Sequence, residues 1–235
     1  MKDNENIYQR TEHLFGAEGL AKIRQAHILL LGIGGVGGAV FEALVRAGVA
    51  KLTVVDGDKF SKSNLNRQLL ANRETIGRSK VAVAKEVAAS INPEVEIEAI
   101  EQRLDRSSAQ HLIAERAADF DILIDCIDDI EAKAAAVKAA TNTPLTILVS
   151  GGAGNRTRPE GVRIDYLENA FSDPFLKKFR KSLGDYPKGR IYTIFSPFKA
   201  MPKRDGMIAS SPYLPNILGF TLAGLALEIL TDIRN

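Results

Sequence analysis

The segment Gly32-Ile33-Gly34-Gly35-Val36-Gly37 restricts the fold more than any other part of the chain. It follows an apolar run at 27–32 and opens a stretch in which apolar residues recur at helical spacing until Gly48. Glycines at such a junction allow a tight turn and let the backbone approach a phosphate at the helix N-terminus. The pattern predicts a nucleotide-binding βαβ unit whose binding residues include Gly32, Gly34, Gly35 and Gly37.

Short apolar runs and helix-period segments alternate through the first 150 residues, which is typical of a parallel sheet covered by helices. Strands are expected at 27–32, 51–55, 95–100, 120–125 and 145–150. Helices are expected at 8–25, 77–91, 107–117 and 129–141. We therefore predict an α/β fold, a Rossmann-like doubly wound and mainly parallel sheet.

The pattern changes after residue 154. Segments 162–167 and 190–195 are expected to be antiparallel or edge strands, and a basic helix is expected from 172 to about 183. Residues 196–216 are expected to form a long loop ahead of a final apolar helix. The chain is predicted to be a single domain, 1–235, divided into an N-terminal helix (1–26), an ATP-binding core (27–154) and a substrate-facing extension (155–235).

Polar residues after the second strand indicate which nucleotide is bound. Asp56 ends that strand about 20 residues beyond the glycine turn, where a carboxylate can accept hydrogen bonds from ribose hydroxyls. A dehydrogenase has no use for the cations that follow, whereas a triphosphate does, because Arg and Lys can stabilise charge on a pyrophosphate leaving group. The residues of this polar run that are predicted to bind ATP are Asp58, Asn64, Arg67, Gln68 and Lys80.

Two carboxylates, Asp128 and Asp129, follow the strand at 120–125. Ligands of open parallel sheets bind beyond the carboxyl ends of the strands, so these side chains are expected near the glycine turn. One of them can hold Mg²⁺, which binds through one or two carboxylates and substrate phosphates. The alternative is that either one simply caps the next helix.

GxGGVG, D-x-D, SNLNRQ, G-x-x-K and D-C-x-D occur here in the order and spacing of the ATP-dependent adenylating family that includes MoeB, ThiF, HesA and the ubiquitin-activating enzymes. The chain resembles that family, whose members make an acyl adenylate from a carboxylate and ATP. The resemblance implies that Arg67, Lys80 and Asp128 are catalytic, with Asp128 as the Mg²⁺ ligand. It also implies a homodimer in which Arg10 reaches the phosphates of the neighbouring subunit.

The single cysteine, Cys126, narrows the choice within the family. Members that activate sulfur carriers usually hold zinc with two cysteine pairs, and thioester-forming members need a cysteine on a mobile segment. This chain can do neither, and Cys126 at a strand end is read as a small buried hydrophobe. Residues 152–183 resemble instead the tRNA threonylcarbamoyladenosine dehydratases, which use ATP to cyclise a modified tRNA nucleoside with loss of water.

The charge distribution agrees with a tRNA substrate. Residues 1–150 hold 18 Lys and Arg against 21 Asp and Glu, whereas residues 151–205 hold 12 against 6. Phosphate contacts supply much of the affinity for nucleic acids, and interleaved aromatic residues can stack on splayed bases. The candidate tRNA-binding residues are Lys177, Lys178, Arg180 and Lys181. The alternative is that they form the solvated face of an amphipathic helix whose Phe side chains are buried.

Other functions remain open from the sequence. The chain can instead adenylate the C-terminus of a ubiquitin-like carrier protein, or bind a nucleotide without catalysis; an NAD-dependent oxidoreductase ranks last. A sulfur-transfer partner is also possible. One free thiol and a polar N-terminus favour the cytoplasm, and the apolar stretch 214–230, interrupted by Asn216 and Glu228, is read as a core or interface helix and not as a membrane span.

Overall fold

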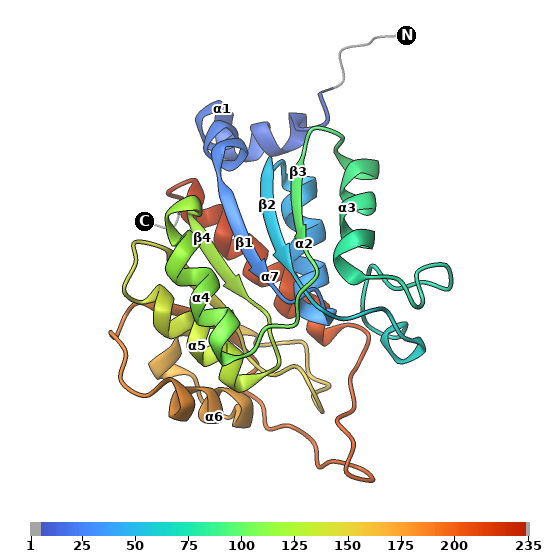
Figure 1. Ribbon diagram of the computed structural model, residues 1–235, viewed down its shortest axis with the longest axis vertical. Coiled ribbons are helices and arrows are strands. Elements are labelled where there is room, and N and C mark those ends of the chain that lie inside the picture. Colours follow the sequence, from blue (N-terminus) through green and yellow to red (C-terminus); the bar gives the residue numbers. More distant parts are fainter. Residues whose placement is uncertain (1–5, 234–235) are drawn as a thin grey trace.

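A seven-stranded sheet with helices on both faces organises residues 6–233, the part of the chain that the computed structural model describes (Figure 1). The strands are β1 (His27–Leu31), β2 (Lys51–Val55), β3 (Glu96–Ile100), β4 (Ile122–Asp125), β5 (Thr146–Ser150), β6 (Arg163–Tyr166) and β7 (Ile191–Phe195). The helices are α1 (Gln9–Gln25), α2 (Gly35–Ala47), α3 (Lys80–Ile91), α4 (Arg106–Arg116), α5 (Ile130–Ala140), α6 (Pro174–Leu183) and α7 (Leu214–Leu230). Three short 3₁₀ turns lie at Lys62–Asn64, Ala117–Asp119 and Leu167–Asn169.

The strand order is β3-β2-β1-β4-β5-β7-β6, and all neighbouring pairs are parallel except β6 with β7. The predicted doubly wound and mainly parallel sheet is confirmed. The segment expected at 162–167 is an antiparallel edge strand, β6, as predicted. The segment expected at 190–195 is antiparallel to β6, but it is an inner strand and not an edge strand, because its other side pairs in parallel with β5. The strand order reverses between β1 and β4, and this is where ligands bind in such sheets.

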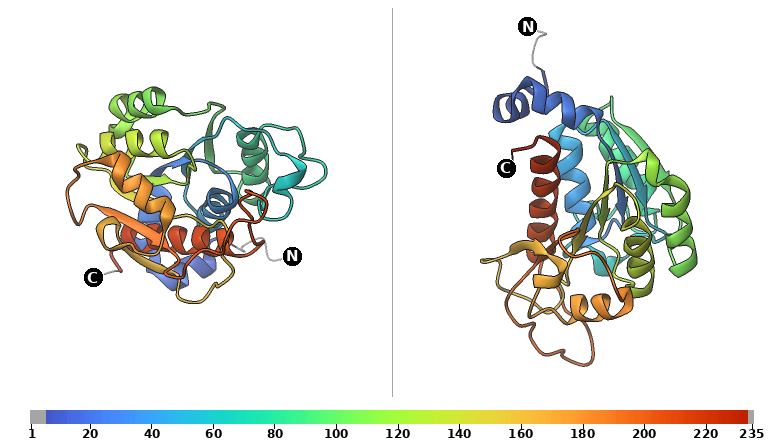
Figure 2. Two further views of the ribbon diagram at one scale, coloured as in Figure 1. Left: turned by 90° about the horizontal axis from the view of Figure 1, so that it is seen from below. Right: turned by 90° about the vertical axis from the view of Figure 1, so that its left-hand side faces the viewer.

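Alternating side chains of the strands supply two separate cores. In β1, Ile28 and Leu30 pack with α2 and α7 on one face, whereas Leu29 and Leu31 pack with α4 and α5 on the other. Figure 2 shows these helices on opposite sides of the sheet. Burial on both faces explains why residues 28–31 of this strand are all apolar.

Two details differ from the prediction. The helix expected from Gly77 begins at Lys80, because Gly77 has a φ of +83° and lies in the turn before the helix. Helix α1 is broken at Gly16, so that Leu20 and Ile23 are buried while Leu14 stays exposed. Helix α1 also packs against α7.

Helix α7 has the predicted role of a core helix. It makes its most extensive contact with α2, and Gly219 permits this because a Cβ there would lie 2.3 Å from the carbonyl oxygen of Val36. Among residues 6–233, no helix is both long enough and apolar enough to cross a membrane.

Candidate active site

A cavity of about 1020 Å³ opens beyond the carboxyl ends of the strands, at the point where the strand order reverses. Most of the residues predicted from the sequence line it, although they come from five separate segments of the chain. They are Gly32, Gly34, Gly35, Asp56, Asp58, Asn64, Arg67, Gln68, Lys80 and Asp128.

The glycine turn owes its shape to close backbone contacts. Gly32 has a φ of +83°, and a Cβ there would lie 3.1 Å from the carbonyl group of Cys126. Gly37 does not line the cavity among the described residues; a Cβ there would lie 1.8 Å from the carbonyl oxygen of Gly32. Gly37 therefore allows α2 to pack against the turn, and the N-terminus of α2 is left open toward the cavity without a side-chain cap.

Asp56 and Lys80 are joined on one wall of the cavity. The Asp56 carboxylate accepts hydrogen bonds from the N–H of Ile33 at 2.7 Å and the N–H of Asp58 at 2.8 Å, so it helps to set the glycine turn. Lys80 is only 5% exposed, and its Nζ lies 3.0 Å from Asp58 and 3.5 Å from Asp56. A buried cation held in place beside a phosphate-binding turn is suited to an anionic ligand.

The polar run at 61–68 forms a second wall around the 3₁₀ turn Lys62–Asn64. The Asn64 side chain accepts from the N–H of Ser61 at 3.0 Å, and Arg67 donates from Nη1 to the carbonyl oxygen of Ser63 at 2.9 Å. A guanidinium has five N–H donors, which leaves Arg67 able to bind a ligand as well. The buried Oε1 of Gln68 finds no hydrogen-bond partner within the described part of the chain.

The structure separates the two carboxylates that the sequence left undecided. Asp129 is the N-cap of α5, because its Oδ1 accepts from the N–H groups of Glu131 and Ala132 at 3.0 and 2.9 Å. Asp128, one residue earlier, is exposed and lines the cavity. Asp129 lines the cavity as well, but its carboxylate is engaged in the cap of α5, so Asp128 is the carboxylate more available to a ligand.

Mg²⁺ fits this site only if the nucleotide supplies ligands. Within residues 6–233, no group of three or more His, Cys, Asp or Glu side chains is arranged to hold a metal ion. Mg²⁺ is characteristically bound through one or two carboxylates, substrate phosphates and water, and Asp128 beside the phosphate-binding turn meets that requirement.

Arg10, unlike Gly37, is a predicted ATP-binding residue that lies far from the site. It is exposed on α1, which lies at the opposite end of the sheet from the cavity (Figure 1), and it is not among the described residues that line the cavity. Within one subunit, Arg10 and Asp128 do not meet.

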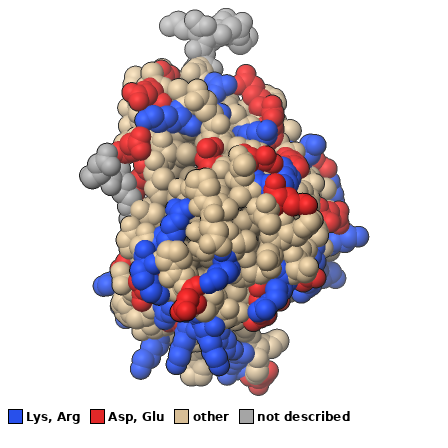
Figure 3. Space-filling view, turned by 60° about the vertical axis from the view of Figure 1, so that its left-hand side comes forward, with Lys and Arg blue, Asp and Glu red and all other residues tan. Residues whose placement is uncertain are grey.

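The basic face of α6 borders the cavity, and only part of it is free for a ligand. Lys177, Lys178 and Lys181 are exposed, and Lys178 lines the cavity itself. Arg180 instead donates from Nη1 to the carbonyl oxygens of Leu167 and Ala170 at 2.9 and 2.7 Å. Lys and Arg side chains gather at the lower end of the molecule in Figure 3.

The aromatic residues of α6 are less available than the sequence suggested. Phe179 is fully buried in the core beneath α6 and Phe175 is half-buried against it, so Phe179 cannot stack on a base. Tyr186 and Tyr192 are half-buried as well. Helix α6 is therefore amphipathic, with its Phe side chains inward and its lysines outward.

Sequence reasoning missed a buried ion pair that shapes the far side of the cavity. Arg156 Nη2 lies 3.6 Å from Asp173 Oδ2, and both side chains are at most 2% exposed. Arg156 also donates to the carbonyl oxygens of Ser172 and Ser196, at 3.0 and 3.2 Å, while Asp173 accepts from the N–H of Gly152. The pair joins three chain segments that are far apart in sequence.

Residues 196–213 form the long loop predicted between β7 and α7, and several of them line the cavity. Asn155 holds this loop through its side-chain oxygen, which accepts from the N–H of Ala209 at 2.6 Å, and its backbone N–H, which donates to Ala209 at 2.7 Å. On the other wall, Asn66 donates to the carbonyl oxygen of Ser210 at 3.1 Å. Met201, Lys203 and Ile208 of the loop line the cavity.

Cys126 is a poor nucleophile. Desolvation raises the pKa of its thiol to about 12, against a weaker opposing effect of Lys133. The thiolate is the reactive form, so a thiol with this pKa stays protonated and inert at neutral pH. The expectation that Cys126 is not a nucleophile agrees with this raised pKa. The expected burial is met only in part, because the side chain is half-buried and lines the cavity.

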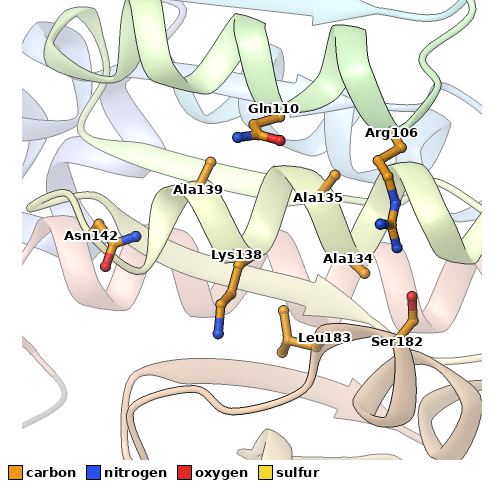
Figure 4. A pocket seen from close by; sticks show the side chains of 9 residues that line it. All are labelled: Arg106, Gln110, Ala134, Ala135, Lys138, Ala139, Asn142, Ser182 and Leu183. Carbon is orange, nitrogen blue, oxygen red and sulfur yellow. The ribbon is translucent and has the colours of Figure 1, made fainter.

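A second cavity, of about 240 Å³, lies between α4, α5 and the end of α6 (Figure 4). Its two cations are engaged by the protein: Arg106 pairs with Glu131 at 2.6 Å, and Lys138 donates to the carbonyl oxygen of Asp185. It contains none of the residues that carry the predicted chemistry, so the larger cavity is the candidate active site.

The fold and the larger cavity define a nucleotide-binding α/β enzyme. The sequence profile of the ThiF family matches residues 8–201, and the chain belongs to this family. The predicted resemblance to the adenylating enzymes is thereby confirmed.

Similar proteins include several tRNA-modifying enzymes. The tRNA threonylcarbamoyladenosine dehydratase of Haemophilus influenzae is 36% identical over 195 residues, which cover 80% of this chain and 73% of the relative. The protein of the same name from Bacillus subtilis is 29% identical over 97% of this chain and 96% of its own length. The crystal structure of the Escherichia coli tRNA N6-threonylcarbamoyladenosine dehydratase in complex with ATP has a TM-score of 0.88 and 26% identity, covering 96% of this chain and 94% of that one.

A different activity is represented by the molybdopterin-synthase adenylyltransferase of Salmonella typhimurium. It is 36% identical, but only over 139 residues, which cover 59% of this chain and 54% of the relative. The likeness to the tRNA dehydratases extends further along the chain.

Proposed function

We propose that this chain is an ATP-dependent adenylating enzyme that dehydrates and cyclises N6-threonylcarbamoyladenosine in tRNA. The observation that carries the proposal is the position of α6: its Lys178 lines the same cavity as Gly34 and Asp128. A polyanionic substrate bound along α6 would therefore reach the nucleotide site directly. The likeness to relatives with this name along most of the chain supports the same substrate.

The residues of the cavity fit the two parts of this reaction. In the first part, the carboxylate of the substrate attacks the α-phosphorus of ATP and pyrophosphate leaves. The open N-terminus of α2 and the cations Arg67 and Lys80 would stabilise the charge that develops on the pyrophosphate, while Asp56 would bind ribose. Lys80 can reach a phosphate by exchanging its partner Asp58, which is exposed.

In the second part, a nucleophile within the modified nucleoside attacks the activated carbonyl carbon, the ring closes, and AMP leaves with one carboxylate oxygen. The net change is the loss of one water from the nucleoside. No enzyme thiol is required, which is consistent with the protonated state of Cys126. The ATP site thus provides the activation, and the substrate provides the nucleophile.

Mg²⁺ is proposed as the metal of the ATP complex, held by Asp128 and the phosphates, where it would supply charge neutralisation. Asn64 and Gln68 would hydrogen-bond the same phosphates, and the unpaired Oε1 of Gln68 would find a donor on the ligand or a bound water.

Mass spectrometry of the nucleoside tests the proposed function. The protein is incubated with ATP, Mg²⁺ and tRNA that bears threonylcarbamoyladenosine, and the expected product is the nucleoside lighter by one water, with AMP formed in step. Unmodified tRNA is the control and should yield no AMP above background. An unchanged nucleoside in the presence of bound ATP would contradict the proposed substrate.

A carrier-protein substrate is the second candidate, favoured by the likeness to molybdopterin-synthase adenylyltransferase over part of the chain. Adenylation of a ubiquitin-like carrier's C-terminus is therefore assayed in parallel. Formation of carrier adenylate without nucleoside dehydration would favour this function and a carrier or sulfur-transfer partner. The absence of cysteine pairs for zinc argues for the tRNA substrate.

The exposed lysines of α6 are expected to bind tRNA phosphates. Changing Lys177, Lys178 and Lys181 together to Gln should weaken tRNA binding and lower the slope of log affinity against log salt by about 2 to 3, because each phosphate contact releases counterions. Filter binding across a range of salt concentrations measures both quantities. Arg180 is left unchanged, because its guanidinium stabilises the turn before α6.

The matched control changes Arg46, Lys51 and Lys85 to Gln, which removes the same charge from exposed positions on α2, β2 and α3. Its salt slope should stay close to that of the unmodified protein. Equal decreases of tRNA affinity and of the salt slope in both variants would show a general effect of net charge, and not a tRNA-binding surface on α6.

The proposal also includes a homodimer, in which Arg10 of one subunit serves the site of the other, and a cytoplasmic location, where tRNA and ATP are both available. Because α1 lies at the other end of the sheet within one subunit, Arg10 would serve a nucleotide site only across a subunit interface (Figure 1).

A further inference from the structure

A fully buried lysine lies beneath the loop that carries Asp128. We propose that Lys133 is a positioning residue, which holds residues 125–128 so that the Asp128 carboxylate can bind the metal of the ATP complex. This inference rests on the proposed function, in which Asp128 meets Mg²⁺.

The ammonium group of Lys133 has three acceptors, all at the end of β4. Its Nζ lies 2.8 Å from the carbonyl oxygen of Asp125, 3.1 Å from Oδ1 of Asp125 and 3.4 Å from the carbonyl oxygen of Ile127. Both charged side chains are 0% exposed. All three N–H donors of the lysine are therefore directed at two residues that come shortly before Asp128.

The rest of the loop is attached at its two ends. At the strand end, Cys126 donates its N–H to the carbonyl oxygen of Leu31 at 2.8 Å. At the helix end, Asp129 caps α5 and also accepts the backbone N–H of Lys133 at 3.0 Å. Lys133 thus lies one helical turn after the cap, and its side chain reaches back across the loop. The chain on both sides of Asp128 is therefore held by hydrogen bonds.

The same loop packs directly against the glycine turn. A Cβ on Gly32 would lie 3.1 Å from the carbonyl group of Cys126 and 3.2 Å from the backbone nitrogen of Ile127. Movement of residues 125–127 would therefore displace the Asp128 carboxylate relative to the phosphate-binding turn. Lys133 does not line the cavity among the described residues, so it acts through the loop and not on the substrate.

Stability alone is a weak explanation for this ion pair. The desolvation of two buried charges offsets much of their attraction, and apolar residues of similar volume often replace such pairs at no cost. The apolar surroundings are suitable for such a replacement, because the Phe175 and Phe179 rings lie 5.8 Å from the ammonium group. What an apolar side chain cannot replace is the three directed hydrogen bonds to the loop.

The test measures metal binding separately from nucleotide binding. Lys133→Met is compared with the unmodified protein and with Lys138→Met, which removes an exposed lysine of the same helix. Mn²⁺, a spectroscopic substitute for Mg²⁺, is titrated by electron paramagnetic resonance in the presence of a non-hydrolysable ATP analogue, and ATP affinity without metal is measured by calorimetry in EDTA. Because Lys133→Met leaves Asp125 without its cation, the double variant Lys133→Met with Asp125→Asn is measured as well.

We expect Mn²⁺ affinity to fall by at least about tenfold in both Lys133 variants, as is usual when the partners of metal ligands are removed, and metal-free ATP affinity to change by less than about twofold. Lys138→Met should match the unmodified protein. Unchanged Mn²⁺ affinity in a folded variant would overturn the inference, as would an equal loss of metal-free ATP binding. Failure of both variants to fold would also overturn it, because the pair would then serve the fold itself. If Mn²⁺ does not bind to the unmodified protein with the analogue, the proposed metal role of Asp128 fails instead.

Discussion

Asp128→Ala is expected to lower the rate of AMP formation by about 10²- to 10³-fold, a loss of the size seen when one group that stabilises transition-state charge is removed. The carboxylate is exposed in the cavity and takes no part in the cap of α5, so the protein should remain folded. AMP is measured by chromatography with tRNA bearing the modified nucleoside. Thermal unfolding should show the same Tm, and ATP should still bind in EDTA.

The neighbouring carboxylate provides a matched control. Asp129→Ser removes a negative charge one residue away, yet Ser is also a good N-cap, so helix α5 should be retained. AMP formation by this variant is expected to stay within about threefold of the unmodified rate. If Asp129→Ser loses as much activity as Asp128→Ala, then Asp128 is not the specific carboxylate that binds the metal. A fully active Asp128→Ala would remove the metal site from this loop.

The parallel core and most of the nucleotide site could be predicted because their signals are local. Most of its strands are short apolar runs, and Gly32 and Asp56 stand at fixed places relative to strand ends that meet at one edge of the sheet. The roles of Asp128 and Asp129 are harder to tell apart in the sequence, because a carboxylate just before a helix suits either metal binding or capping of that helix. Only the hydrogen bonds from Glu131 and Ala132 assign the cap to Asp129.

The parts that escaped prediction depend on contacts between distant segments. Nothing near Arg156 in the sequence indicates that Asp173 and Ser196 will be its partners. In the sequence, the cation of Arg180 cannot be told from that of Lys178. In the structure, however, the Arg180 guanidinium donates to two carbonyl oxygens, in and just after the 3₁₀ turn that follows β6. Likewise, Gly77 is compatible with a helix in a periodic pattern, and its φ of +83° becomes evident only in the folded turn.

Arg10→Ala is expected to cause a loss of similar size to that of Asp128→Ala, provided that Arg10 completes the phosphate site of a partner subunit. The position of Arg10 in the fold makes its action on a partner subunit testable. Helix α1 is anchored by the buried Tyr8, whose ring lies 2.9 Å from where a Cβ on Gly48 would be, and Arg10 is exposed at the end of the sheet opposite the cavity. Arg10 can therefore act on the phosphates only in a second copy of the chain.

Heterodimers of defined composition distinguish action in trans from action in cis. The first heterodimer combines one Arg10→Ala copy with one Asp128→Ala copy and is purified through two different tags. If Arg10 acts across the interface, this heterodimer contains one site with both residues intact, and about half of the unmodified activity is expected.

The reciprocal heterodimer pairs an unmodified copy with a copy that carries both changes. Action in trans predicts that it is inactive, because the intact Asp128 then faces a partner without Arg10, whereas action in cis predicts about half activity. The two heterodimers carry the same substitutions in equal number, so a difference in their activities shows only whether Arg10 acts within one subunit or between subunits. Half activity in the reciprocal heterodimer would contradict the proposed arrangement.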